Sequence, residues 1–203
     1  MTQTITALYD TYDAAVSAVD ALEASGIPHS DISIVSNNVD RRYDQDRPSN
    51  AAADAGTGAG IGAAVGGVGG LLTGLGLMAI PGVGPVVAAG WLVATAVGAI
   101  GGAVVGGAAG GLVGSLTGAG VPERDANFYA EGVRRGGTLV TARVDDARAP
   151  RTREILRSQK WVDPDVRGAA YREGGWTAFD ANAPAYTPEE IAAERQRYIG
   201  RDI

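Results

Sequence analysis

The feature that most constrains this 203-residue sequence is a block at positions 55–122 that contains no charged side chain and no histidine. This block holds 23 of the 31 glycines, and every charged residue of the chain lies outside it. The surface of a soluble domain is built largely from charged and polar side chains. The block is therefore not expected to form an ordinary soluble domain by itself.

The glycines of the block recur at every fourth position in two ladders. The first ladder consists of Gly58, Gly62, Gly66, Gly70 and Gly74, and the second of Gly98, Gly102, Gly106, Gly110, Gly114 and Gly118. Between the ladders lie Pro81, Gly82, Val83, Gly84 and Pro85, which cannot be helical throughout. The spacing therefore predicts a long Gly/Ala-rich α-helical hairpin over residues 55–122, with its turn at these five residues.

Helical arms of this composition need a partner, because each interior glycine destabilises a helix by about 1 kcal/mol relative to alanine. A line of missing side chains lets two helix backbones approach closely and gain van der Waals contact. The ladders are thus predicted to be self-association surfaces, and the expected partner is a second copy of the chain in a homo-oligomer.

The sequence leaves two alternatives for the environment of the hairpin, a membrane and a soluble assembly. An arm over residues 57–80 would be about 36 Å long, enough to cross a hydrocarbon core of about 30 Å. Arginines flank the block but are missing from its turn, which favours a hairpin in or on the inner membrane with both ends in the cytoplasm. Because glycine and alanine are weak insertion signals, the alternative is a soluble cytoplasmic filament, ring or cage with the hairpins in its core.

The residues around the block predict one small domain. Residues 1–36 have the pattern of a β-α-β unit, residues 37–54 that of a polar connector, and residues 123–159 that of an α-β-α unit. Neither half alone buries enough surface to be stable. We therefore expect a split α+β domain, formed by residues 1–36 and 123–159, with a small ferredoxin-like sheet and helices on one face.

Residues 160–203 are expected to form an aromatic C-terminal arm with a short helix. Thr187, Pro188 and Glu190 have the spacing of a helix start, in which threonine caps the helix and glutamate returns the hydrogen bond. The arm is expected to dock either on its own domain or on a neighbouring subunit.

The sequence contains few of the residue types that catalytic and metal sites use. Cysteine is absent and histidine occurs once, which excludes disulfides, thiolate metal sites and relays of several histidines. The net charge of -6 argues against nucleic-acid binding. We predict a protein that is not an enzyme, with no catalytic residues, cofactor, metal or small-molecule substrate. Residues 1–9 lack the pattern of a secretory signal, which supports a cytoplasmic location.

One further charged feature is a run of arginines near position 150. It is predicted to be the solvated face of a helix, with an anionic lipid surface as its functional alternative. The run consists of Arg148, Arg151, Arg153 and Arg157.

The combination of a β-α-β unit, a charge-free Gly/Ala block and two later segments resembles the YflT-type family of bacterial heat-induced or general stress proteins. The residues that carry the resemblance are 80–85 (IPGVGP), 120–126 (GVPERDA) and 136–144 (GGTLVTARV). The likeness extends over about residues 4–159, and the polar connector and the C-terminal arm depart from the family pattern. The resemblance implies a stress-induced protein with a small α+β domain and no known enzymatic activity.

Overall fold

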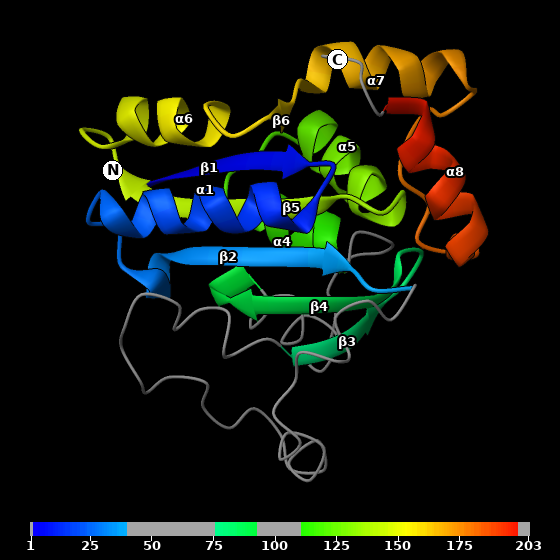
Figure 1. The fold of residues 1–203 in the computed structure, drawn as a ribbon, viewed down its shortest axis with the longest axis horizontal. Helices are drawn as coiled ribbons and strands as arrows, with labels where there is room; N and C mark the ends of the chain where they lie inside the picture. Colours follow the sequence, from blue (N-terminus) through cyan, green and yellow to red (C-terminus); the bar gives the residue numbers. More distant parts are fainter. Residues whose placement is uncertain (1, 40–75, 93–110, 199–203) are drawn as a thin grey trace, which may run out of the picture.

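Six strands form one antiparallel sheet in the computed structural model (Figure 1), which describes residues 2–39, 76–92 and 111–198. The strands are β1 (Thr2–Tyr9), β2 (Ile32–Asn37), β3 (Gly76–Ile80), β4 (Gly84–Gly90), β5 (Thr138–Asp145) and β6 (Trp161–Val162). Their order in the sheet is β3-β4-β2-β5-β1-β6. The predicted α+β class is confirmed.

The two halves of the chain interleave in this sheet. Strand β5 lies between β1 and β2, and its Val140 pairs with Ala7 on one side and Ile34 on the other. The N-terminal β-α-β unit is therefore split by a strand that follows it by about a hundred residues in the sequence. Neither half could build this sheet alone, because the central strand belongs to the other half.

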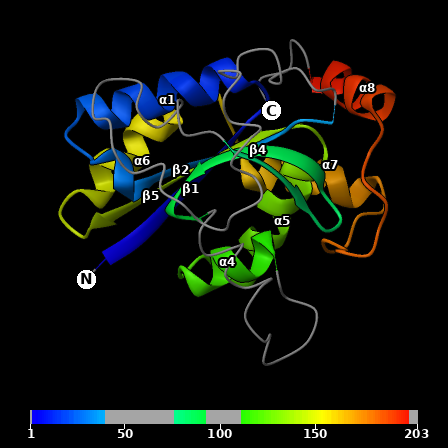
Figure 2. The same ribbon diagram turned by 90° about the horizontal axis from the view of Figure 1, so that it is seen from below.

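Helices cover both faces of the sheet, so the predicted placement on one face is wrong (Figure 2). On one face lie α1 (Tyr12–Ala24) and α6 (Ala149–Arg157), and on the other α4 (Leu112–Gly118) and α5 (Glu123–Arg134). The physical reason is visible in β2, in which all six residues are buried and both faces therefore need a cover. Helix α4 supplies part of the second cover, and its residues come from the uncharged block.

The predicted helical hairpin is wrong where the structure describes the block between the ladders. Residues 76–80 and 84–90 form the antiparallel strands β3 and β4, and β4 pairs with β2. The chain turns between them, with Gly82 and Gly84 at φ values of 75° and 94°. Val86 and Val87 are buried, and β-branched side chains suit a strand better than a helix. This stretch therefore extends the sheet of the domain.

The C-terminal arm packs on its own domain. It contributes β6, which pairs with β1, followed by α7 (Pro164–Glu173) and α8 (Pro188–Tyr198). The predicted start of α8 is confirmed, since Glu190 N donates to Thr187 Oγ1 and Thr187 N donates to Glu190 Oε2. Aromatic contacts hold α7 in place, with the ring of Tyr171 stacked 5.7 Å from that of Phe128. Of the two docking alternatives, the structure has the intramolecular one.

Candidate functional site

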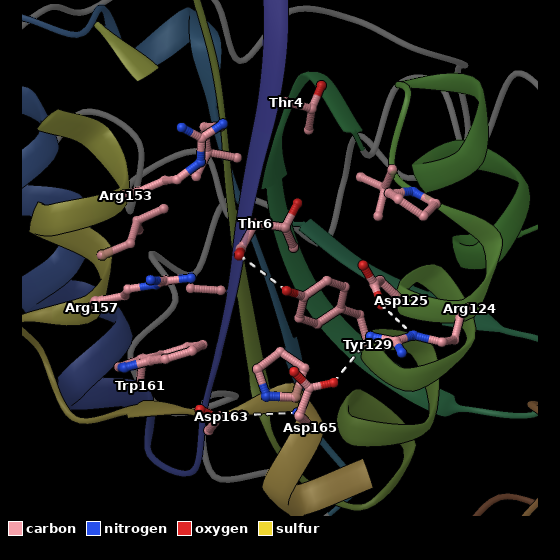
Figure 3. A pocket seen from close by; sticks show the side chains of 16 residues that line it. Thr4, Thr6, Arg124, Asp125, Tyr129, Arg153, Arg157, Trp161, Asp163 and Asp165 are labelled. Carbon is pink, nitrogen blue, oxygen red and sulfur yellow. Dashed lines mark hydrogen bonds and ion pairs between the residues drawn. The ribbon is translucent and has the colours of Figure 1, made fainter. Parts of the chain in front are cut away.

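A groove of about 490 Å³ lies between α5 and α6, beside the edge of β1 (Figure 3). One wall carries Arg153, Arg157 and Trp161, and the opposite wall carries Arg124 and Tyr129. Residues 4–7 of β1 line the groove between the two walls. Its volume is within the range of about 300–1,000 Å³ that is usual for ligand sites in proteins.

The groove exists because the last strand of the sheet is short. Strand β6 has two residues, which pair with Leu8 and Tyr9. Pro164 then starts α7, and Asp163 caps this helix by accepting hydrogen bonds from the backbone N–H groups of Asp165 and Val166. Proline lacks the N–H group that a continuing strand would need. The chain therefore turns away from β1 and leaves the edge of residues 2–7 uncovered by β6.

The α6 wall of the groove is cationic. Arg153 Nη2 donates to the side-chain oxygen of Gln3 at 2.8 Å, and the guanidinium of Arg157 lies 4.8 Å from the ring centroid of Trp161. Neither guanidinium has a carboxylate within 4.0 Å among the described residues. The other two arginines of the run are paired, Arg148 just before α6 with Asp145 and Arg151 with Glu154. The predicted solvated face thus divides into two paired arginines and two that line the groove.

The α5 wall is nearly balanced in charge. Arg124 bridges Asp125 at 3.1 Å and Asp165 at 3.0 Å, so the carboxylates on this wall already have a cationic partner. The hydroxyl of Tyr129 donates to the backbone oxygen of Thr6 at 3.2 Å. Burial, with a smaller contribution from Asp125, raises the pKa of Tyr129 above its ordinary value, so the phenol remains a hydrogen-bond donor at neutral pH.

These groups are suited to binding. The groove presents guanidinium, hydroxyl, phenol, indole and carboxylate side chains, and its lining includes no histidine. The described residues contain no group of three or more His, Cys, Asp or Glu side chains placed to hold a metal ion. The groove lining contains three arginines and three aspartates, but the positive charge is concentrated on the α6 wall, where Arg153 and Arg157 have no carboxylate partner among the described residues. This wall favours a ligand that carries anionic groups.

A second polar feature, the α5–α8 ion cluster, holds the C-terminal arm on the domain. It consists of Glu131, Arg134 and Arg135 near the end of α5 and Glu194 of α8. Arg135 donates to Glu131 at 2.6 Å and to Glu194 at 2.8 Å, and its guanidinium lies 4.2 Å from the ring centroid of Tyr171. Glu131 is fully buried. Burial lowers the pKa of Arg135, but the hydrogen bonds to Glu194 and Glu131 outweigh this effect and raise it.

The predicted self-association residues are mostly outside the described residues. Two ladder glycines are described, Gly114 and Gly118, and both belong to the short helix α4. The others lie outside the described part of the chain: Gly58, Gly62, Gly66, Gly70, Gly74, Gly98, Gly102, Gly106 and Gly110. The five turn residues, Pro81, Gly82, Val83, Gly84 and Pro85, join β3 to β4, and a side chain at Gly82 would meet Asp180 and Ala181 of the C-terminal arm.

Sequence reasoning did not find the groove. Its walls come from β1, α5, α6 and the connection from β6 to α7, which are up to about 160 residues apart in the chain. The one local signal is the spacing of Arg153, Arg157 and Trp161, which lie four residues apart and so follow one side of a helix and its extension.

The buried tyrosines predict a loss of stability at high pH. The pKa values of Tyr9, Tyr129 and Tyr171 are all raised, chiefly by burial. In the unfolded chain tyrosine ionises near pH 10. The contribution of these tyrosines to stability is therefore expected to be complete up to about pH 9 and to fall above about pH 10, by up to about 1.4 kcal/mol per pH unit for each tyrosine.

Urea unfolding between pH 8 and pH 11 measures this slope, and absorbance at 295 nm reports ionised tyrosine. Tyr129→Phe removes one of the three groups and should make the slope shallower. Ionisation of all tyrosines near pH 10 in a protein that stays folded would contradict the burial described above.

The antiparallel sheet with helices on both faces defines the chain as an α+β protein. A comparison with family profiles matches residues 4–81 to the heat induced stress protein YflT domain. The matched segment includes most of β1 and all of α1, β2 and β3, and it ends at the start of the turn before β4. Over this segment the chain is similar to the YflT-type stress protein family, in agreement with the resemblance seen in its sequence. Comparisons with curated proteins and with solved structures found no match.

Proposed function

We propose that the protein is a general stress protein without enzymatic activity, which self-associates through the two uncharged segments at residues 55–75 and 93–110. The family match supports the general role in stress. The proposal of self-association rests on the positions at which these two segments join the folded domain. The first ends where β3 begins, and the second starts three residues after the end of β4.

The β3–β4 hairpin brings these two junctions together. Gly76, the first residue of β3, pairs with Ala88, close to the last residue of β4. Both uncharged segments therefore connect to the same end of an edge hairpin, one entering the sheet and the other leaving it. This arrangement supports close packing of the glycine ladders with each other and with those of another copy.

The same arrangement bears on how the protein would associate with a membrane. Each uncharged segment is flanked on both sides by elements of one domain: β2 and β3 for the first, β4 and α4 for the second. A single crossing would put those flanks on opposite sides of the bilayer. The described residues include no helix that is long and apolar enough to span a membrane. The position of the flanking elements in one domain supports association with the cytoplasmic surface of the inner membrane in place of a spanning hairpin.

The alternative is a soluble cytoplasmic assembly, a filament, ring or cage, in which the same segments meet without lipid. The weak apolar character of glycine and alanine favours this version. Both versions share self-association, and they differ in the response to lipid vesicles. Neither version requires a nucleic acid or a small-molecule substrate.

Exchange of two ladder glycines tests the proposal. Gly66→Leu combined with Gly106→Leu is expected to reduce the mean oligomer mass at least to half, because the added side chains separate the packed backbones. Sedimentation velocity of the full-length protein measures the mass. The control is Val65→Leu combined with Val105→Leu, which adds bulk next to the ladder positions but leaves the ladders intact. An unchanged mass in the glycine variant, or a monomeric wild-type protein, would contradict self-association through the ladders.

Flotation with vesicles of anionic phospholipid separates the two environments. Recovery of the wild-type protein with the vesicles, lost in the glycine variant, supports the membrane version. Recovery of an intact oligomer in the lipid-free fraction supports the soluble version and contradicts the membrane one.

A further inference from the structure

The edge of β1 beside the groove is open to a further strand. Strand β5 pairs with β1 along residues 2–9, whereas β6 covers the other edge at Leu8 and Tyr9. The backbone groups of alternate residues point to the same edge of a strand. Since Tyr129 reaches the backbone oxygen of Thr6 from the groove, Thr4 and Thr6 direct their backbone N–H and C=O groups into it. Exposed edges of this kind pair readily with extended peptides.

The α6 wall determines which peptide would fit. Arg153 and Arg157 face the groove without a carboxylate partner among the described residues, while Arg124 on the other wall is bridged by two. A strand laid along β1 would therefore have positive charge on its α6 side and a nearly neutral surface on its α5 side. Charge complementarity favours acidic side chains on the α6 side.

The distance between Arg153 and Arg157 along the helix is close to the distance between alternate residues of a strand. Four residues of a helix advance by about 6.0 Å, and two residues of a strand by about 6.8 Å. Arg153, Arg157 and Trp161 follow one another along the direction of β1 (Figure 3). Acidic residues at alternate positions of an added strand would thus each meet one guanidinium.

We propose that this groove binds an extended peptide segment with acidic residues at alternate positions, which adds to β1 as an antiparallel strand in line with β6. The acidic side chains pair with Arg153 and Arg157, and the residues between them exchange backbone hydrogen bonds with Thr4 and Thr6. The carbonyl of Thr6 has a second lone pair besides the one used by Tyr129. The proposal is independent of self-association through the glycine ladders.

The β1 edge of a second copy of the chain would fit this groove less well than an acidic peptide. Two β1 edges paired by a twofold axis would bring the α6 helices to the same face of a continuous sheet. Arg153 and Arg157 of both copies would then face each other, and like charges in this arrangement repel. A separate acidic segment avoids this repulsion.

Anisotropy of a fluorescein-labelled octapeptide tests the proposal with the full-length protein at low salt. In the probe, glutamate alternates with valine, and in a comparison peptide lysine replaces glutamate. The structure leads us to expect saturable binding of the glutamate peptide, and binding of the lysine peptide at least tenfold weaker. No binding of the glutamate peptide, or equal binding of both peptides, overturns the proposal.

N-methylated peptides test the strand geometry. In an antiparallel pair, directly opposite residues have their side chains on the same face. Thr4 directs its side chain to the α5 side, where its hydroxyl donates to the backbone oxygen of Ala119. The peptide residues that bond to Thr4 and Thr6 are therefore the valines. N-methylation of the valines should abolish binding, whereas N-methylation of the glutamates should be tolerated; equal binding of both peptides contradicts strand addition and leaves only an ionic contact.

Two double variants assign the binding to the α6 wall. Arg153→Gln with Arg157→Gln is expected to weaken binding about tenfold, since it removes two exposed ion pairs. Arg148→Gln with Arg151→Gln removes the same charge from the N-cap and first turns of α6, at arginines that are already paired, and should change affinity less than about twofold. All four side chains are exposed, so the fold is expected to be retained, which circular dichroism checks. Equal loss in both variants would reduce the effect to net charge and overturn the assigned site.

Discussion

Replacing Arg135 by methionine is expected to destabilise the protein by about 3–5 kcal/mol, because it removes the shared partner of two buried carboxylates. Glu131 is fully buried and would retain only Arg134, at 3.3 Å. Glu194, which is 5 % exposed, would retain an exposed partner, Arg197. Methionine replaces much of the apolar volume of the arginine, so the expected loss is mainly that of charge compensation. Urea unfolding at pH 7 measures it.

Arg197→Met is the matched control for this prediction. It removes an ion pair of the same Glu194, but its own side chain is 67 % exposed, and such pairs contribute less than about 1 kcal/mol. Adding Glu131→Gln and Glu194→Gln to Arg135→Met should restore part of the lost stability, because the unpaired buried charges are then gone. Equal effects of Arg135→Met and Arg197→Met would contradict a buried ion cluster between α5 and α8.

Replacing Gly90 by alanine is expected to destabilise the protein by about 2–4 kcal/mol. Gly90 ends β4 with φ of 95°, a conformation that residues with a side chain rarely adopt. A Cβ atom there would also overlap the backbone oxygen of Ile32 and lie 2.7 Å from the Cα atom of Ser33. Backbone atoms of the neighbouring strand cannot move aside without disturbing the pairing of β2 and β4.

The sign of this effect distinguishes the structure from the helical hairpin that the glycine spacing predicts. In a helix, Gly90→Ala would stabilise the protein by about 1 kcal/mol. Gly118→Ala is the control, because Gly118 belongs to α4 and a Cβ atom there would have nothing within 4 Å. That variant should change stability by no more than about 1 kcal/mol, in the stabilising direction. Thermal and urea unfolding of both variants decide between strand and helix at residue 90.

The elements outside the block could be predicted from local patterns. Alternation over residues 4–9 and 138–144 indicates strands, and the structure has β1 and β5 there. Helix α8 begins where the threonine cap and the following proline predict it, since both signals are local hydrogen-bond and backbone preferences. The two-residue strand β6 offers no period, and neither this strand nor helix α7 was predicted.

The prediction of a helical hairpin failed at residues whose conformation is not determined by local preference. Glycine at every fourth position is compatible with a helix ladder, and the same residues also suit turns and positive φ values. Residues 84–90 adopt a strand because β2 presents an edge to them, and Val86 and Val87 become buried there. Residues 76–80 in turn pair with this strand. A local pattern cannot show which distant strand will supply that edge.

The sequence by itself determined the α+β class, the resemblance to the YflT-type family, the helices and strands with clear period and caps, and the unusual character of the uncharged block. The tertiary structure alone decided that helices cover both faces, that part of the block extends the sheet, and that a groove with one cationic wall follows β1. These features depend on pairing between residues far apart in the chain, as between Thr6 and Tyr129. Local propensity determines what a segment can form, whereas burial against distant partners determines which of those forms is the stable one.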